Sequence, residues 1–305
     1  MSTPSPVPPK PLKPLRGVRV LSLALNLPGP AAFMRLKAMG ATCAKAEPPG
    51  PKGAPAGTSG DPMGQYNPTA YATLHQGIKV LSIDLKTEKG QARLHQELAR
   101  TDLLLTSFRP SALAKLGLGW KALHKAYPQL SVVAIVGAPG ERAEEPGHDL
   151  TYLAEAGLVN DMSLPATLFA DMGGALMASE AALKAVLNQR TSGKGSFQEM
   201  ALSDAAAWLA LPRTWGLTQP TGAVGGAHAG YRVYACKDGR VAVAALEPHF
   251  AAALCRVAGV NMADLRAMFQ PQTHASITAF FAGQTRKQLD KLAAANDIPL
   301  HTLPA

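Results

Sequence analysis

The sequence predicts an α/β protein with a large Rossmann-like domain, built on an open parallel sheet, and a smaller α+β domain. In the first half, short apolar runs of strand length alternate with longer stretches whose apolar residues have helical spacing. Later in the chain, a hairpin pattern precedes sequence of mostly helical character. A length of 305 residues is enough for a large core and two structural lobes.

The first elements have the order of a parallel βαβ unit. Residues 17–24 predict a buried strand, which the Leu-Pro-Gly-Pro run at 27–30 interrupts. Residues 31–39 have helical spacing of apolar residues, and Gly40 is typical of a helix stop. Residues 42–47 predict the second strand, so strand, loop, helix and strand follow one another.

The same alternation continues to residue 136. Residues 48–71, rich in Gly, Pro and Ser, predict a surface excursion. Strands alternating with helices after it favour a Rossmann-like open sheet. The sequence predicts these strands at 79–85, 103–106 and 130–136, and helices at 88–100 and 111–127, the second broken at 117–119.

The pattern changes after Gly147, where the predicted helices and strands have a different order. The sequence predicts helices at 149–158 and 173–190, a strand at 196–202, a helix from Ser203, a hairpin of 231–236 and 240–246 around Asp238-Gly239, and mostly helix over 247–305. We therefore expect a disordered Pro-rich arm at 1–14, a large Rossmann-like domain at 15–225, which is the part expected to bind the ligand, and a small domain at 226–305.

Composition narrows the classes of partner. A net charge of +9 suits an anionic ligand with several phosphates, such as coenzyme A, while no stretch combines clustered Lys and Arg with aromatics as nucleic-acid-binding segments do. No apolar run approaches the roughly 18–20 residues of a membrane helix. The three cysteines are widely spaced and form neither a metal motif nor a disulfide framework. We expect a cytoplasmic protein with no metal, no nucleic-acid partner and no membrane contact.

Three short segments carry acid–base side chains in an informative order. They contain His148, Asp171 and Glu247, and the first also contains Asp149. A His and a carboxylate facing each other across a carbon can remove a proton from one face and return it to the other, and an imidazole suits this exchange near neutral pH. By position alone, Asp171 reads equally well as a helix N-cap, and Glu247 as a solvated residue at a strand end.

Motifs spread over the chain carry a resemblance to a known family. They are Gly29-Pro30, Met39-Gly40-Ala41, Ile83-Asp84-Leu85-Lys86, Phe108-Arg109-Pro110, Leu116-Gly117-Leu118, Gly147-His148-Asp149, Ala170-Asp171, Gly173-Gly174, Ser192-Gly193-Lys194-Gly195, Asp238-Gly239 and Leu246-Glu247-Pro248. The chain resembles class III CoA-transferases of the CaiB/BaiF type, and within them the α-methylacyl-CoA racemases. The resemblance implies two domains and a homodimer of two interlocked chains.

The resemblance also implies roles for the acid–base residues. His148 and Asp171 would be the two acid–base groups, and Glu247 would reach the His and set its tautomer. Asp149 would position His148 or cap the following helix. Backbone amides near Asp171, at a helix N-terminus, would hold the oxygen of the enolate intermediate.

For coenzyme A, the resemblance points to the segment after the fourth strand. Phe108 would stack on adenine, Arg109 and Lys115 would meet phosphates, and Leu116 belongs to the same segment. Lys79 is a further candidate. Coenzyme A would enter as part of an acyl-CoA thioester substrate, with no permanently bound cofactor and no metal.

The reaction that this pattern favours is epimerisation of 2-methylacyl-CoA, or a related 2-substituted acyl-CoA, by removal and return of the α-proton through an enolate. A CoA-transferase, in which Asp171 would form an acyl anhydride, is the first alternative. A catalytically weak or inactive CoA-binding paralogue is the second. It is motivated by Pro48-Pro49 where relatives usually carry an Arg, by Gln76-Gly77 before a strand, and by an end near Pro304, where relatives continue with a segment that returns to the large domain.

Overall fold

The structure is a computed structural model that describes residues 12–55 and 57–305. Most of the predicted Pro-rich arm, residues 1–11, lies outside the described residues. By its internal packing the chain divides after Ala210, and the second unit is Leu211–Ala305. The segment 211–225, which we expected in the large domain, therefore belongs with the second unit. The two units are described separately below.

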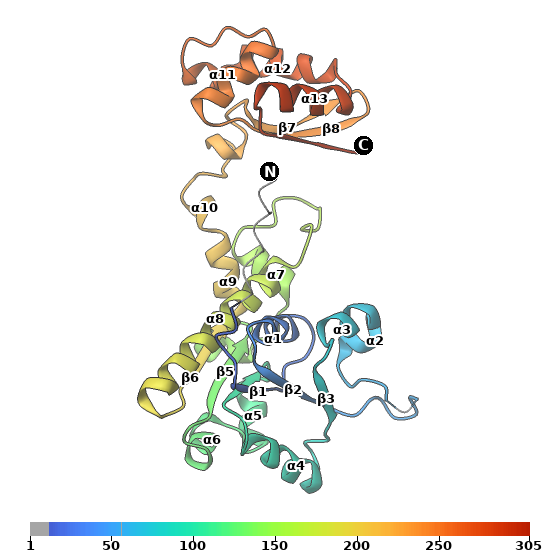
Figure 1. Ribbon diagram of the computed structural model, residues 1–305, viewed down its shortest axis with the longest axis vertical. Helices are drawn as coiled ribbons and strands as arrows, with labels where there is room; N and C mark the ends of the chain where they lie inside the picture. The colour runs from blue at the N-terminus through green and yellow to red at the C-terminus, as the bar shows by residue number, and fades with distance from the viewer. Residues whose placement is uncertain (1–11, 56) are drawn as a thin grey trace, which may run out of the picture. The chain divides into compact units, whose positions relative to one another are not determined.

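The first unit contains a six-stranded sheet in the order β3-β2-β1-β4-β5-β6 (Figure 1). Every pair of neighbours is parallel, so the predicted Rossmann-like open sheet is confirmed. Strands β1 and β4 are neighbours at the middle of the sheet, and later strands are added outward from them in opposite directions, β2 and β3 on one side and β5 and β6 on the other. Sheets of this class bind their ligands at this switch point. The strands are β1 (Arg19–Ser22), β2 (Thr42–Glu47), β3 (Lys79–Ser82), β4 (Leu103–Thr106), β5 (Ser131–Val136) and β6 (Phe197–Ala201).

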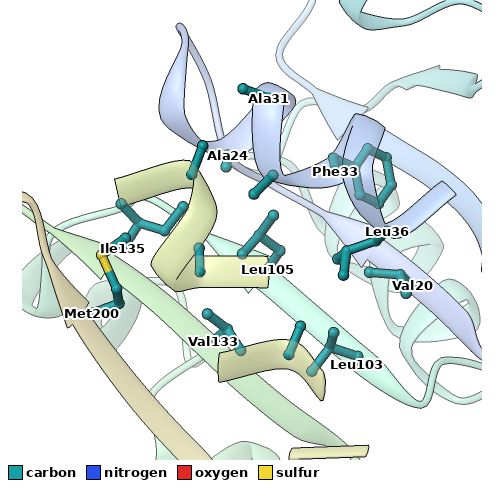
Figure 2. Close-up of a cluster of buried hydrophobic side chains, with 14 of the residues drawn as sticks. Val20, Ala24, Ala31, Phe33, Leu36, Leu103, Leu105, Val133, Ile135 and Met200 are labelled. Carbon is teal, nitrogen blue, oxygen red and sulfur yellow. The ribbon is translucent and has the colours of Figure 1, made fainter. Parts of the chain in front are cut away.

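Helices cover both faces of this sheet, and successive side chains of β4 divide between them. Leu103 and Leu105 join the cluster packed by α1 and α8, part of which Figure 2 shows, whereas Leu104 joins the cluster packed by α4, α5 and α6. The helices of this unit are α1 (Pro28–Ala38), α2 (Pro62–Tyr66), α3 (Pro68–Leu74), α4 (Glu88–Leu98), α5 (Pro110–Lys115), α6 (Trp120–Ala126), the 3-10 turn η1 (Gly140–Glu144), α7 (Asp149–Glu155), α8 (Phe169–Ser192) and α9 (Leu202–Leu209).

Three predicted boundaries in this unit were wrong. The helix predicted at 31–39 starts earlier, because α1 begins at Pro28, and proline fits the first helical turn, where its missing N–H has no partner to lose. The supposed surface excursion contains α2 and α3, each with an Asp or Asn N-cap before a proline. Helix α8 begins at Phe169 rather than at Gly173.

The second unit packs helices against a three-stranded antiparallel sheet, in the order β7-β8-β9 (Figure 1). The predicted hairpin is confirmed, with Cys236 opposite Gly239 at its turn. Strand β9 was missed by the helical reading of 247–305. The elements are α10 (Leu211–Thr214), the turn η2 (Ala223–Gly225), β7 (Tyr231–Cys236), β8 (Gly239–Ala244), α11 (Pro248–Val257), the turn η3 (Leu265–Phe269), α12 (Pro271–Ala282), α13 (Arg286–Asn296) and β9 (Leu300–Leu303).

Candidate active site

A cavity of about 180 Å³ lies at the carboxyl ends of β1, β4 and β5. Its walls include Asn26 after β1, the segment 107–109 after β4, and Gly137 after β5. His148 and Asp171 line the same cavity. The cavity therefore occupies the position between β1 and β4 where the strand order of the sheet reverses.

His148 and Asp171 reach the cavity from two different helices. His148 is the residue before α7, with an exposed side chain. Its backbone is fixed by Thr151, whose hydroxyl accepts from the His148 amide at 3.1 Å and donates to the His148 carbonyl at 2.7 Å. Asp171 lies half-buried in the first turn of α8. The two predicted acid–base residues are thus brought together.

Asp149 connects the beginnings of these two helices. Its buried carboxylate lies in the first turn of α7 and accepts a hydrogen bond from the Asp171 backbone amide at 2.9 Å. The pKa of Asp171 is raised to about 6, chiefly by burial and in addition by the nearby negative charge of Asp149, while His148 acts in the opposite direction. Asp171 can therefore exchange a proton near neutral pH, which an ordinary aspartate cannot.

Two expectations about this helix terminus need correction. Asp171 is not the N-cap of α8, because Leu168 occupies that position and the Asp171 amide instead bonds the Asp149 carboxylate. The amides expected to hold an enolate oxygen are also largely occupied. Those of Phe169, Asp171 and Met172 donate to the Thr167 carbonyl, the Asp149 carboxylate and the Leu168 carbonyl, three of the first four amides of α8.

The buried Tyr152 also lines the cavity, and the sequence pattern did not predict it as a site residue. Its hydroxyl lies beneath two glycines: a Cβ on Gly137 would stand 2.2 Å from it, and one on Gly147 2.4 Å. Burial raises the pKa of this phenol, and the Asp171 charge adds to the effect. The signal that could have found it is its spacing, because a residue four positions after His148 lies on the same face of a helix.

The residues expected to bind coenzyme A are only partly brought together. Phe108 and Arg109 line the cavity, with the Arg side chain exposed. Lys115 and Leu116 lie at the end of α5, where Leu116 packs on the core and Lys115 is exposed. Lys79 is the first residue of β3. Because all strands of the sheet are parallel, it lies at their amino-terminal ends, away from the cavity, beside a separate hollow.

Glu247 belongs to the second unit. It is exposed, follows β8 and precedes Pro248, the first residue of α11. Its carboxylate makes no capping hydrogen bond to that helix. Its suggested action on His148 remains a prediction. Within residues 12–55 and 57–305, no group of three His, Cys, Asp or Glu side chains could hold a metal, and no helix is long and apolar enough to cross a membrane.

The sequence of this chain is similar to those of known racemases and transferases of acyl-CoA. The mouse α-methylacyl-CoA racemase is 29% identical over 90% of this chain and 73% of its own length, and the mouse succinyl-CoA:glutarate CoA-transferase 27% over 93% and 67%. A probable fatty acyl-CoA transferase of Mycobacterium tuberculosis is 32% identical over 65% of this chain, but the match spans only about half of that protein, 53%.

A solved structure supports the same relationship. The crystal structure of a hypothetical protein from Mycobacterium tuberculosis superposes with a TM-score of 0.81 and 25% identity, covering 96% of this chain and 84% of that one. The sequence profile described as CoA-transferase family III matches residues 15–304, which is nearly the whole chain. With relatives that include both racemases and transferases, the protein belongs to CoA-transferase family III.

Proposed function

We propose that this protein epimerises 2-methylacyl-CoA, or a related 2-substituted acyl-CoA thioester, at the carbon next to the carbonyl. One observation carries the proposal: His148 and Asp171 line one cavity, and the pKa of Asp171 is raised to about 6. An imidazole and a carboxyl group with this acidity are matched as proton donor and acceptor near neutral pH.

The reaction uses one proton shared by the pair. The unprotonated member removes the proton from C2, and the electron pair of that C–H bond moves into the thioester to form a planar enolate. The protonated member then delivers its proton to the other face of C2, and the enolate electrons re-form a C–H bond of opposite configuration. The pair ends with its proton on the other residue, which is the protonation state that the reverse reaction needs.

Coenzyme A takes part only as the carrier of the acyl group, with no permanently bound cofactor. The exposed Arg109 guanidinium at the cavity is suited to a phosphate, and Phe108 beside it offers a ring for stacking. The net charge of +9 favours an anionic ligand of this kind. Lys79 is not among the proposed coenzyme A ligands, because it lies at the amino-terminal ends of the strands, away from the cavity.

We further propose that two chains form the interlocked homodimer and that the protein acts in the cytoplasm. The long helix α8 exposes apolar side chains in support of the first, among them Met172, Leu176 and Leu187. Trp208 of the neighbouring α9 is 69% exposed and borders a hollow of about 380 Å³ on this face. In support of the second, Cys43, Cys236 and Cys255 are all free thiols.

A CoA-transferase is the second candidate, and the position of Asp171 is what favours it. A carboxylate at the edge of a cavity can attack the thioester carbonyl and displace the CoA thiolate, forming an acyl anhydride that a second acid then receives. The relatives include transferases as well as racemases. His148 favours the epimerase, because anhydride formation needs no second acid–base group.

Replacing each member of the pair separates the candidates. His148→Ala and Asp171→Ala should both abolish interconversion of the stereoisomers, while His124→Ala, a histidine of α6 outside the cavity, should not. A His148→Ala protein that kept the parent turnover would contradict the two-base mechanism. Transfer of CoA from an acyl-CoA to added succinate, lost only in Asp171→Ala, would establish the transferase. A parent protein with no activity but retained CoA binding would be the inactive paralogue.

A further inference from the structure

The proposed reaction needs a hydrogen-bond donor for the oxygen that becomes negative in the enolate. At the start of α8, three of the amides expected to hold this oxygen already donate hydrogen bonds to other groups of the protein. The Tyr152 hydroxyl is enclosed beneath Gly137 and Gly147. The donor is therefore to be sought elsewhere on the cavity wall.

Asn26 is the wall residue with an unused carboxamide. It lines the cavity at the carboxyl end of β1 and is half-buried. Among the described residues, its side chain makes no hydrogen bond, whereas its backbone amide donates to Asp61 at 3.1 Å. Asn26 also has a φ of 61°, a left-handed conformation that few residues other than Gly, Asn and Asp adopt.

A fully buried ionic cluster holds Asn26 in this conformation. Asp61 accepts from the amides of Asn26 and Met63 through one carboxylate oxygen, at 3.1 and 3.0 Å, and pairs with the Lys45 ammonium through the other. Lys45 and Asp61 are both inaccessible to solvent. The ammonium also lies 3.2 Å from Glu47 and 3.0 Å from the His75 ring.

Such a cluster is rigid, because separating a buried ion pair leaves an uncompensated charge away from water. The turn that follows is equally constrained. A Cβ on Gly29 would stand 2.2 Å from the Ala24 side chain, so the first turn of α1 packs directly on the end of β1. Asn26 lies between these two fixed points, so its position beside the cavity is set before any ligand binds.

We propose that the Asn26 carboxamide is a catalytic residue, and that its N–H donates a hydrogen bond to the thioester oxygen and holds it as it becomes the enolate oxygen. The Lys45–Asp61 pair positions it through the backbone amide. This inference rests on the proposed epimerase. No bond to Asn26 is made or broken, and the carboxamide keeps both of its protons throughout.

The test uses variants that keep the backbone conformation. Asn26→Gly tolerates a φ of 61° and deletes the carboxamide, and Asn26→Asp keeps the shape but replaces the donor with a carboxylate. The matched control is Asp297→Gly, at the other described non-glycine residue with a left-handed φ, in the second unit. Each protein is given 2-methylpropanoyl-CoA in D2O, and loss of the α-proton signal is followed by NMR.

Loss of one preorganised donor lowers kcat by roughly 10²–10³-fold, so Asn26→Gly should lose that much with KM changed by less than about threefold. Asn26→Asp should lose at least as much, and Asp297→Gly should match the parent. With thioester labelled with carbon-13 at the carbonyl, the bound resonance of the parent should lie downfield of the free one, and Asn26→Gly should remove most of that displacement.

Two results would overturn the inference alone. One is an Asn26→Gly protein with parent kcat, and the other is an unchanged carbonyl resonance in that variant. A 10²-fold loss in Tyr152→Phe with none in Asn26→Gly would assign the donor to Tyr152 instead. A parent protein that exchanges no α-proton would overturn the proposed function, and this inference with it.

Discussion

The acidity of Asp171 depends on two neighbours as well as on burial. Asp149 lies close enough to hold the Asp171 amide and to raise the pKa of its carboxyl, and His148 opposes that effect. Neither contact could be derived from the sequence, in which Asp149 and Asp171 are separated by a helix and a long loop. The pattern singled out both side chains, but the Asp149 carboxylate bonds the Asp171 amide rather than positioning His148 or capping its own helix.

The pH profile follows from the shared proton. The pair works only when it holds one proton, so kcat/KM should be bell-shaped and identical in both directions, since the equilibrium between the stereoisomers does not depend on pH. Activity should fall as the pH drops through about 6, where Asp171 keeps its proton and no base remains.

The same profile can be shifted in a known direction. Asp149→Asn removes the negative charge that raises the pKa of Asp171 but keeps an oxygen for the Asp171 amide, so the acidic limb should move to lower pH. Asp204→Asn, at an exposed aspartate in the first turn of α9, serves as control. An acidic limb that stays in place in Asp149→Asn would contradict this account of the acidity.

Asp171 should also lower the stability of the fold. Its pKa is higher in the folded than in the unfolded chain, so ionisation opposes folding, with the cost absent below about pH 4 and complete above about pH 6. Asp171→Asn should raise the free energy of unfolding at pH 7 by roughly 1–3 kcal/mol, and the gain should shrink as the pH approaches 4. Urea denaturation at several pH values measures this. Equal stability of variant and parent at pH 7 would show that the carboxylate is not destabilised.

At the scale of elements, local signals predicted the strands well. A run of three leucines followed by the β-branched Thr106 placed β4 at its observed bounds, Leu103–Thr106. Helix α8 was predicted to begin too late because Gly173-Gly174 suggested a helix start. The second glycine is there for packing, since a Cβ on Gly174 would stand 2.4 Å from Leu202, and such contacts are not visible in a sequence.

The close contact between α7 and the loop before it gives another prediction. Gly147→Ala should displace the Tyr152 ring, lower stability by roughly 1–3 kcal/mol and reduce turnover. Removing the hydroxyl in the Gly147→Ala/Tyr152→Phe double variant should recover part of the stability, which thermal unfolding would detect. Gly119→Ala, where no atom lies within 4 Å, is the control. Failure of the double variant to recover any stability would place the strain elsewhere.

At the scale of the whole molecule, long-range pairing limited the sequence reading. Strand β9 has the weakly alternating sequence Leu-His-Thr-Leu, and it pairs with β8 about 60 residues earlier. The buried Lys45–Asp61 pair was equally hidden, because its members come from β2 and from a segment that reads as loop. Order of elements can be predicted from local pattern, whereas such pairings depend on the finished fold.

The proposed interlocked dimer gives a further prediction. Two threaded chains cannot separate without unfolding, so the mass in solution should be twice 31.8 kDa and should stay so on dilution to nanomolar concentration. Tagged and untagged chains should exchange subunits only after denaturation and refolding together. A monomer at micromolar concentration, or exchange within minutes in native buffer, would contradict the interlocking.

The central claim is that His148 and Asp171 exchange a proton at C2 of an acyl-CoA. Proton NMR of a single stereoisomer of a 2-methylacyl-CoA, incubated in D2O with the purified protein, tests it most directly. The account predicts loss of the α-proton signal together with appearance of the other diastereomer, and the other diastereomer should not appear with His148→Ala or with Asp171→Ala. An α-proton signal that persists with the parent protein while the thioester is bound would contradict it.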